Sequence, residues 1–474
     1  MKKMLRIVSL CLMSLLMVLP TAFAEDPAAV ASKIDTGDTA FVLVSAALVM
    51  LMTPGLALFY GGMVRTKNVL STLMQSFFIV GLVSVQWVLW GYTVAFGPDI
   101  NHLIGGFDWL GLSGVGQEPN ADYAATIPHL AFMIFQGMFA VITPALISGA
   151  FAERMKFPAF LVFTLAWATF VYDPVAHWVW GTGGWLREMG VLDFAGGTVV
   201  HIISGVSGLV IALMLGKRKD YGKKAIIPHN LPMVLIGGSL LWFGWFGFNA
   251  GSALGANGLA ASAFVTTHAS AAAATVSWAL AEWLYSGKPT VLGAVSGCVA
   301  GLVAITPGAG FVSPLSSIII GLAGGVICFF SVSVMKAKLG YDDALDAFGV
   351  HGVGGTFGAI ATGLFASKEI NPAGADGFFF GNTDQLLIQV IGVVASWAVA
   401  IVMTYILIKI ISVFMPIRST VDEENSGLDI ADHGEKAYAY QDLITEFSGA
   451  PAFMSAPVIS EKVAFQVAIE GDKK

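Results

Sequence analysis

The sequence is poor in charged residues and has no cluster of basic side chains. Asp, Glu, Lys and Arg make up only 12% of its 474 residues, about half the share that is usual in soluble proteins. This scarcity excludes a string of soluble domains, and without a basic cluster we expect no binding to nucleic acid. No Cys/His spacing resembles a zinc site, so we expect neither a metal nor another cofactor.

Cysteine is also scarce, and the first of the three lies in a segment that resembles a secretory signal peptide. Residues 1–24 combine three early basic residues, an apolar core at about 7–19 and a cleavage site of the small-x-small type at 22–24. A first transmembrane helix is the less favoured interpretation, because the core is short and Pro20 interrupts it. Cys298 and Cys328 lie within apolar runs, so we expect no structural disulfide.

Long apolar segments, by contrast, are abundant. The chain is 56% hydrophobic and has 55 glycines, as expected where helices pack closely in lipid. Segments of membrane length must be helical, since a lone span has to satisfy its own backbone hydrogen bonds. The sequence therefore predicts an all-α polytopic membrane protein. We expect eleven transmembrane helices, at about 39–63, 70–97, 127–152, 157–181, 194–216, 230–250, 258–286, 290–306, 314–338, 347–366 and 384–414.

The charges between the spans predict their orientation. Three basic residues fall on one side, namely Lys33, Arg187 and Lys368. Fourteen fall on the other: Arg65, Lys67, Arg154, Lys156, Lys217, Arg218, Lys219, Lys223, Lys224, Lys288, Lys336, Lys338, Lys409 and Arg418. Because cytoplasmic loops carry the excess of positive charge, the second side should face the cytoplasm. The mature amino terminus would then be outside, in agreement with the signal segment.

Two histidines lie in matching sequence patterns. Asp193 precedes His201 by eight residues at the start of the fifth span, and Asp343 precedes His351 by eight at the tenth. In both copies glycines follow the histidine at the fourth and seventh positions. Five spans separate the copies, and an odd number turns the second copy upside down. The pattern predicts two inverted five-helix repeats, followed by a final helix.

The spacing also predicts where the histidines lie. Eight residues of helix rise about 12 Å, close to half of the ~30 Å hydrocarbon thickness. Because the two helices enter from opposite sides, His201 and His351 should both lie near the midplane. One such histidine would be a packing residue more often than not, but a symmetry-related pair flanked by glycines favours a pore site. Neutral imidazole has one donor and one acceptor and can pass protons near neutral pH.

The aspartates have a simpler structural interpretation. Asp193, Asp343 and Asp346 lie where helices are expected to begin, and Asp is a good N-cap near the positive end of a helix dipole. We therefore expect structural or electrostatic roles for these three residues. Asp193 could also influence a cation that arrives from outside.

Several long motifs, in the right order, resemble the ammonium transporter (Amt/Mep/Rh) family, and its bacterial Amt branch in particular. The resemblance covers roughly residues 39–440. It implies an eleven-helix homotrimer in which each subunit has one narrow pore. The most specific stretches are PGLALFYGGMVRTKNVLS, FQGMFAVITPALISGAFAER, DFAGGTVVHI, PHNLPMV, WFGWFGFNAGSA and DAFGVHGVGG.

By motif position, the resemblance also implies a set of site residues. The stacked gate would be Phe139 and Phe248, with His201 and His351 in the pore below. Aromatic faces attract a cation by about 0.5–2 kcal/mol, and a hydroxyl replaces part of its hydration shell. The outer ammonium recruitment site would consist of Phe139, Trp180 and Ser252.

The segment after about Arg418 is expected to form a cytoplasmic tail. Its stretch GLDIADHGEKAYAY, residues 427–440, resembles the family's regulatory segment and implies a signal protein of the PII family as partner. We therefore expect three parts: a signal peptide at 1–24, a transporter domain at 25–417 and a regulatory tail at 418–474. The last 33 residues depart from the family pattern, and neither they nor His268 receive a role.

Two functions remain open, and a third is disfavoured. Transport of ammonium or ammonia across a bacterial inner membrane is the first. A sensor that reports ammonium through a cytoplasmic partner is the alternative. An enzyme is not expected, because the histidines have no metal-ligand carboxylate beside them and nothing resembles an activated nucleophile.

Overall fold

The computed structural model describes residues 33–438, and from Ile34 onward they form one body built mainly of helices. The predicted signal peptide, Cys11 and the residues after Tyr438 lie outside the described part. Within it, Cys298 and Cys328 are buried free thiols.

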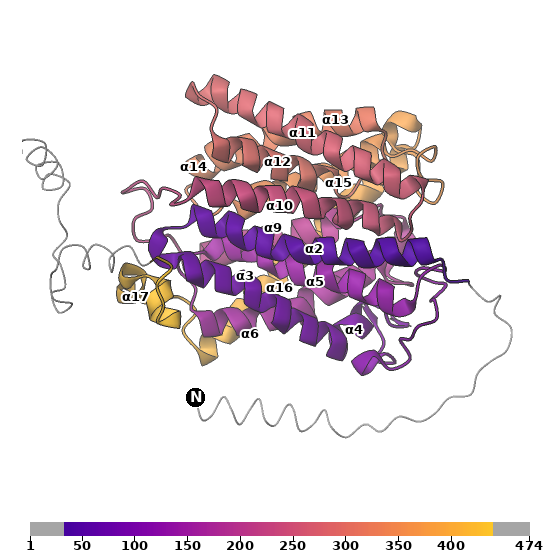
Figure 1. The fold of residues 1–474 in the computed structure, drawn as a ribbon, viewed down its shortest axis with the longest axis horizontal. Helices are drawn as coiled ribbons and strands as arrows, with labels where there is room; N and C mark the ends of the chain where they lie inside the picture. Colours follow the sequence, from indigo (N-terminus) through magenta and orange to yellow (C-terminus); the bar gives the residue numbers. More distant parts are fainter. Residues whose placement is uncertain (1–32, 439–474) are drawn as a thin grey trace, which may run out of the picture. The chain divides into compact units, whose positions relative to one another are not determined.

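Ten helical segments of the described chain are long and apolar enough to cross a membrane, and they lie alongside one another in Figure 1. The first five contain α2 (Thr36–Met63), α3 and α4 (Val69–Gln86, Tyr92–Phe96), α5 (His129–Phe151), α6 to α8 (Phe157–Trp167, Asp173–Trp180, Trp185–Met189) and α9 (Ile203–Leu215). The others contain α10 (Leu231–Ala250), α11 (Gly258–Ser286), α13 and α14 (Pro314–Phe330, Lys336–Leu339), α15 (Val353–Phe365) and α16 (Thr383–Phe414).

The predicted eighth span differs from the rest. It is α12 (Val291–Ile305), a helix of 15 residues, which at ~1.5 Å per residue is about 22 Å long and shorter than the hydrocarbon core. Pro307 is the second residue after the end of α12, and a proline has no backbone N–H that could donate a hydrogen bond. The next turns are buried, Thr306 and Ala309 completely, and irregular backbone is tolerated at membrane depth where protein covers it. Residues 33–438 thus contain ten full-length spans and one short one.

Wide helical turns of the π type interrupt several spans at matching places. Residues 168–172 and 331–335 lie in the fourth and ninth predicted spans, and 197–202 and 348–352 begin the fifth and tenth. Such turns add a residue locally and are common at functional sites. Their correspondence between the two halves supports the internal repeat, as does the packing of α2 against α10, the first helices of the two halves (Figure 1).

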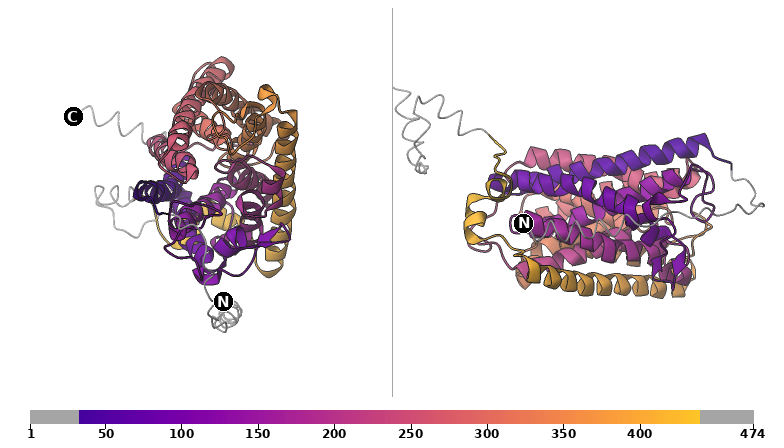
Figure 2. Two further views of the ribbon diagram at one scale, coloured as in Figure 1. Left: turned by 90° about the vertical axis from the view of Figure 1, so that its right-hand side faces the viewer. Right: turned by 90° about the horizontal axis from the view of Figure 1, so that it is seen from below.

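The two ends of the bundle are distinct. The N-terminal face holds the start of α2 and a long connection, residues 97–128, with a short hairpin of β1 (Asp99–Ile100) and β2 (Ile104–Gly105). The C-terminal face holds α17 (Val421–Ser426), which lies across the end of the bundle, while α16 runs along its side (Figure 2). Large apolar side chains point outward from α10, α11, α13 and α16, as expected of a surface that faces lipid.

The tail is docked on the C-terminal face. Lys156 is central to this contact: its backbone N–H donates to the Ile417 carbonyl at 2.9 Å, and its Nζ pairs with Glu423 at 2.7 Å. Further along, the backbone N–H of Ser71 donates to the Asp429 carboxylate at 2.8 Å. The tail segment up to residue 438 is therefore part of the folded structure.

A buried network of ion pairs, which we call the inner ion network, ties the loops of the same face together. Asp342 pairs with Arg154 at 3.1 Å and with Arg218 at 2.8 Å, and Glu153 pairs with Arg65 at 2.7 Å. Burial would raise the pKa of Asp342 and of Glu153, but hydrogen bonds from the arginines outweigh it and lower both pKa values. Burial lowers the pKa of Arg154 to about 10.

Candidate functional site

Two glycine contacts bring the helices of the histidines together. A Cβ atom on Gly205 would lie 2.1 Å from the backbone nitrogen of Gly352, and one on Gly355 would lie 2.9 Å from the Cβ of His201. Any larger residue at either position would therefore collide with the partner helix. The glycines four residues after each histidine thus let α9 touch the wide turn at 348–352 and α15 touch the wide turn at 197–202, where the two spans cross next to His201 and His351.

The two imidazoles meet at this crossing. The Nδ1 atoms of His201 and His351 are 3.2 Å apart, and the ring planes are inclined by 23°. Both side chains are buried, and the Nε2 atom of His201 has no hydrogen-bond partner among residues 33–438. A hydrogen bond between neutral rings requires one donor and one acceptor, so the two rings must be opposite tautomers.

Asp193 and Asp343 lie at the starts of these two spans and accept hydrogen bonds from helix backbone groups. The Asp193 carboxylate accepts from the N–H groups of residues 196–198 at 2.6 to 2.8 Å, and that of Asp343 accepts from Ala347 and Phe348. Burial, and next the charge of Asp346, raise the pKa of Asp343.

Asp346 behaves differently from the cap expected at its position. Its carboxylate pairs with Lys336, and its backbone is left-handed, with a φ of 63°. The residue lines cavities on the C-terminal side of the histidines, so it contributes charge to that side of the bundle.

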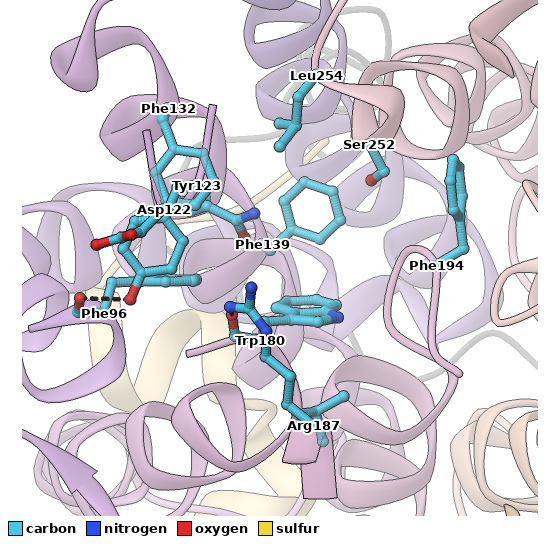
Figure 3. A pocket seen from close by; sticks show the side chains of 12 residues that line it. Phe96, Asp122, Tyr123, Phe132, Phe139, Trp180, Arg187, Phe194, Ser252 and Leu254 are labelled. Atoms are coloured by element: carbon cyan, nitrogen blue, oxygen red, sulfur yellow. Dashed lines mark hydrogen bonds between the residues drawn. The ribbon is translucent and has the colours of Figure 1, made fainter. Parts of the chain in front are cut away.

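Aromatic side chains form a cavity of about 230 Å³ at the N-terminal face (Figure 3). Phe139, Trp180 and Ser252 all line it, and the rings of Phe139 and Trp180 meet edge to face at 5.9 Å. Two of these groups are already held by backbone carbonyls: Trp180 Nε1 donates to Asp193 and Ser252 Oγ to Phe248, both at 2.8 Å. Both oxygen lone pairs of the Ser252 hydroxyl face away from that bond and remain available to an N–H donor.

Phe139, which lines this cavity, is in contact with a second ring, that of Phe248, and the two ring planes are tilted by 34°. The ring centroids of Phe139 and Phe248 are 4.3 Å apart, and both residues are buried. Below them, Phe248 lines a second cavity of about 10 Å³ with His201 and His351, room for about one molecule of the size of water. The aromatic pair thus separates the outer cavity from the histidines.

The cavities continue to the C-terminal face. His351 also lines a third cavity, of about 40 Å³, whose walls include Asp346. Asp346 in turn borders a cavity of about 320 Å³ with Arg218, Lys224 and Lys336. The second, third and fourth of these cavities share lining residues with their neighbours, and the contact of Phe139 with Phe248 separates the first from the second. Together they form one narrow line through the bundle, apolar in the middle and polar at both ends.

The structure adds residues that our sequence interpretation did not assign. The indole of Trp245 stacks on the ring of His201 at 5.4 Å, and its Nε1 donates to Thr306. Arg187, counted earlier only as an outer charge, reaches up beside Trp180 in Figure 3 and donates to its carbonyl at 2.9 Å. No sequence signal distinguished Trp245 among 12 tryptophans. Within residues 33–438, no group of three His, Cys, Asp or Glu side chains is placed to hold a metal.

A membrane-spanning helix bundle with one narrow path, closed by two rings and containing a buried histidine pair, defines a channel or transporter for a small polar solute. The chain belongs to the ammonium transporter family, since the model of the Ammonium Transporter Family matches residues 40–438.

Individual relatives agree with this assignment. The chain is 60% identical over 402 residues to an ammonium transporter of Bacillus subtilis, covering 85% of this chain and 98% of the relative. It resembles the crystal structure of Candida albicans Mep2 with a TM-score of 0.79 and 36% identity, over 88% of this chain and 93% of that one. A solved structure named Sensor Amt Protein matches with a TM-score of 0.78 and 29% identity, over 84% and 98% of the two chains. The Bacillus subtilis relative is named a transporter, not an enzyme.

Proposed function

We propose that the protein recruits ammonium at its N-terminal face and conducts ammonia past the histidine pair to its C-terminal face. The observation that carries the proposal is the line of cavities, in which the narrow central cavity is lined by His201 and His351 among mostly apolar side chains. NH4+ is held among Phe139, Trp180 and Ser252, and loses a proton near the aromatic pair; that proton either returns to the outer solution or crosses separately along the histidine pair. Desolvating the ion is far more costly than desolvating neutral NH3, so NH3 is the species that passes the apolar section.

The orientation and surroundings follow from the charge bias. Fourteen basic residues against three, counted between the spans, support a cytoplasmic C-terminal face and an outer N-terminal face. In this arrangement residues 1–24 are a cleaved signal peptide, residues 25–417 form the transporter domain in a bacterial inner membrane, and residues 418–474 form the tail. The outward apolar surfaces of α10, α11 and α13 fit lipid and the other subunits of a homotrimer.

The test is ammonium flux into proteoliposomes, measured for the wild type and for Trp180→Leu/Ser252→Ala. The double variant is expected to raise the half-saturating ammonium concentration about tenfold, because it removes a cation–π contact of about 0.5–2 kcal/mol and a hydroxyl acceptor. Selectivity over potassium should fall as well, since potassium lacks the N–H donors of ammonium.

Trp178→Leu is the matched control, because Trp178 lies on the same helix but does not line the cavity. Unchanged affinity and selectivity in the folded double variant would contradict the recruitment site. A wild-type protein that binds ammonium but passes none would favour the alternative function, that of a sensor. The similarity to the structure named Sensor Amt Protein supports this alternative.

The docked tail leads to a second prediction. Truncation after Arg418 removes the contacts of Glu423 with Lys156 and of Asp429 with Ser71. We expect transport to fall about fivefold or to lose its response to a PII-family protein, by the usual size of coupling between distant sites. Flux with and without the PII protein measures this. Truncation after Tyr438 keeps the docked segment and should behave as wild type; if both truncated chains do so, the tail is passive.

A further inference from the structure

A carboxyl group and an amide face each other in the membrane-spanning part of the bundle, outside the line of cavities. Gln86 is the last residue of α3, directly before the wide turn at 87–91. Asp173 is the first residue of α7, directly after the wide turn at 168–172. Both are buried, with exposed fractions of 1% and 0%, and Gln86 Nε2 donates to Asp173 Oδ2 at 2.7 Å.

The remaining two oxygens of this pair have no hydrogen-bond partner in the described part of the chain. Asp173 Oδ1 and Gln86 Oε1 are both buried and make no hydrogen bond to any of residues 33–438. An amide carbonyl and a carboxylate oxygen are both acceptors, so they cannot satisfy each other while Asp173 is ionised. Among residues 33–438, no basic side chain forms an ion pair with Asp173 either. An isolated carboxylate and an unpaired carbonyl, buried side by side, are both costly.

A single proton removes both costs. Placed on Asp173 Oδ1, it gives the acid an O–H donor for the carbonyl oxygen of Gln86, while the existing bond from Gln86 Nε2 to Asp173 Oδ2 stays in place. The result is a reciprocal pair with two parallel hydrogen bonds. A buried carboxylic acid that stays neutral in order to donate a hydrogen bond is an established arrangement in proteins.

We propose that Asp173 holds a proton and forms a reciprocal acid–amide pair with Gln86, which fixes α7 against α3 and positions Trp180. Trp180 is the last residue of α7, seven residues or about 10 Å beyond Asp173 on the same rigid helix. Asp173 is thus a positioning residue. Its effect on ammonium recruitment rests on the proposed function, whereas the bound proton does not.

Infrared spectroscopy of the full chain in lipid, with aspartate labelled at its side-chain carboxyl carbon, tests the proton directly. Near neutral pH, the wild type is expected to show the C=O stretch of a protonated carboxyl group, and Asp173→Asn is expected to lack it. Asp108→Asn, at an exposed carboxyl, is the control and should leave that band in place. Identical bands in the wild type and Asp173→Asn would overturn the proposal.

Ammonium flux tests the positioning role. Asn at position 173 can still donate to the Gln86 carbonyl and accept from its amide, so Asp173→Asn should keep the wild-type half-saturating concentration within about twofold. Asp173→Leu and Gln86→Leu each leave the other polar side chain buried without a partner, and each should raise the half-saturating concentration about fivefold or more. The double Leu variant leaves neither group unpaired and should show a smaller increase than the sum of the two.

Two results would contradict the reciprocal pair. One is an equal increase of the half-saturating concentration in Asp173→Asn and Asp173→Leu, and the other is an increase in the double Leu variant that equals the sum of the two single ones. A wild-type chain without ammonium flux would refute the proposed function instead, and the infrared result would still decide whether Asp173 carries a proton.

Discussion

Potassium should pass through the protein when either His201 or His351 is replaced by Asp. The replacement puts a fixed anion at the narrowest part of the line of cavities, where it offsets the desolvation of an entering cation. Replacement of either residue by Ala removes the polar pair instead, and the ammonium-driven current should fall about tenfold or more, as expected when a proton relay is interrupted. Current and potassium permeability in proteoliposomes, measured for all four single variants, test these expectations.

His268 provides a matched control. It lies on α11, is exposed, and contacts Trp242 and Phe246 rather than any of the described cavities. His268→Ala should leave both currents unchanged. If all four variants at the central pair also kept wild-type current and selectivity in an intact oligomer, the two histidines would be packing residues.

Asp342→Ala should destabilise the protein by about 3–5 kcal/mol, the usual cost when one partner of a buried ion pair is removed. Asp342 is paired with both Arg154 and Arg218, whose side chains are 0% and 6% exposed, so the substitution leaves two buried guanidinium groups without their shared carboxylate. Thermal unfolding of the solubilised protein measures the loss.

Asp220→Ala is the control for this experiment. Asp220 pairs with Arg65, but both side chains are partly exposed, at 28% and 23%, and such pairs contribute no more than about 1 kcal/mol. If Asp342→Ala and Asp220→Ala lowered the stability of the protein equally, the burial of the inner ion network would not be the reason for its contribution.

The same network predicts how stability depends on pH. The pKa values of Asp342 and Glu153 are lowered in the folded protein. Their contribution to the free energy of unfolding is therefore fully present above the pKa values of the unfolded state, which are about 4. It is lost as the pH falls through the lower folded values. The pH profile of the unfolding temperature should therefore decline below about pH 4 in the wild type, and less steeply in Asp342→Ala.

Much of the fold could be predicted because each span carries its own signal. Membrane length and apolar composition located the long helices, and the matched spacing of Asp193 with His201 and of Asp343 with His351 indicated the repeat. Residues 290–306 were expected as one of the spans and form α12 (Val291–Ile305); that this helix is shorter than the others could not be predicted, because composition cannot distinguish a helix from buried turns that neighbouring helices cover. The wide turns were not anticipated, since no residue type marks them.

The site was predictable to a smaller extent. The histidines were placed by symmetry, but Phe139, Trp180 and Ser252 came only from the family resemblance, because one aromatic among 33 phenylalanines and 12 tryptophans carries no positional information. Asp173 was overlooked, although it lies inside the span expected at 157–181, because it is not part of the repeat pattern that singled out Asp193 and Asp343. Its partner Gln86 is 87 residues away, and only the folded chain brings them together.

The crossing of α9 and α15 has a consequence for how the protein can move. At Gly205 and Gly355 the two backbones touch, with no side chain between them to rearrange. Neither half can slide past the other there without a collision, so the crossing is a fixed contact at the level of the histidines. Transport in which the two halves slide against each other would have to break this contact. Rotation of the Phe139 and Phe248 rings would open the path between the two cavities without any change at the crossing.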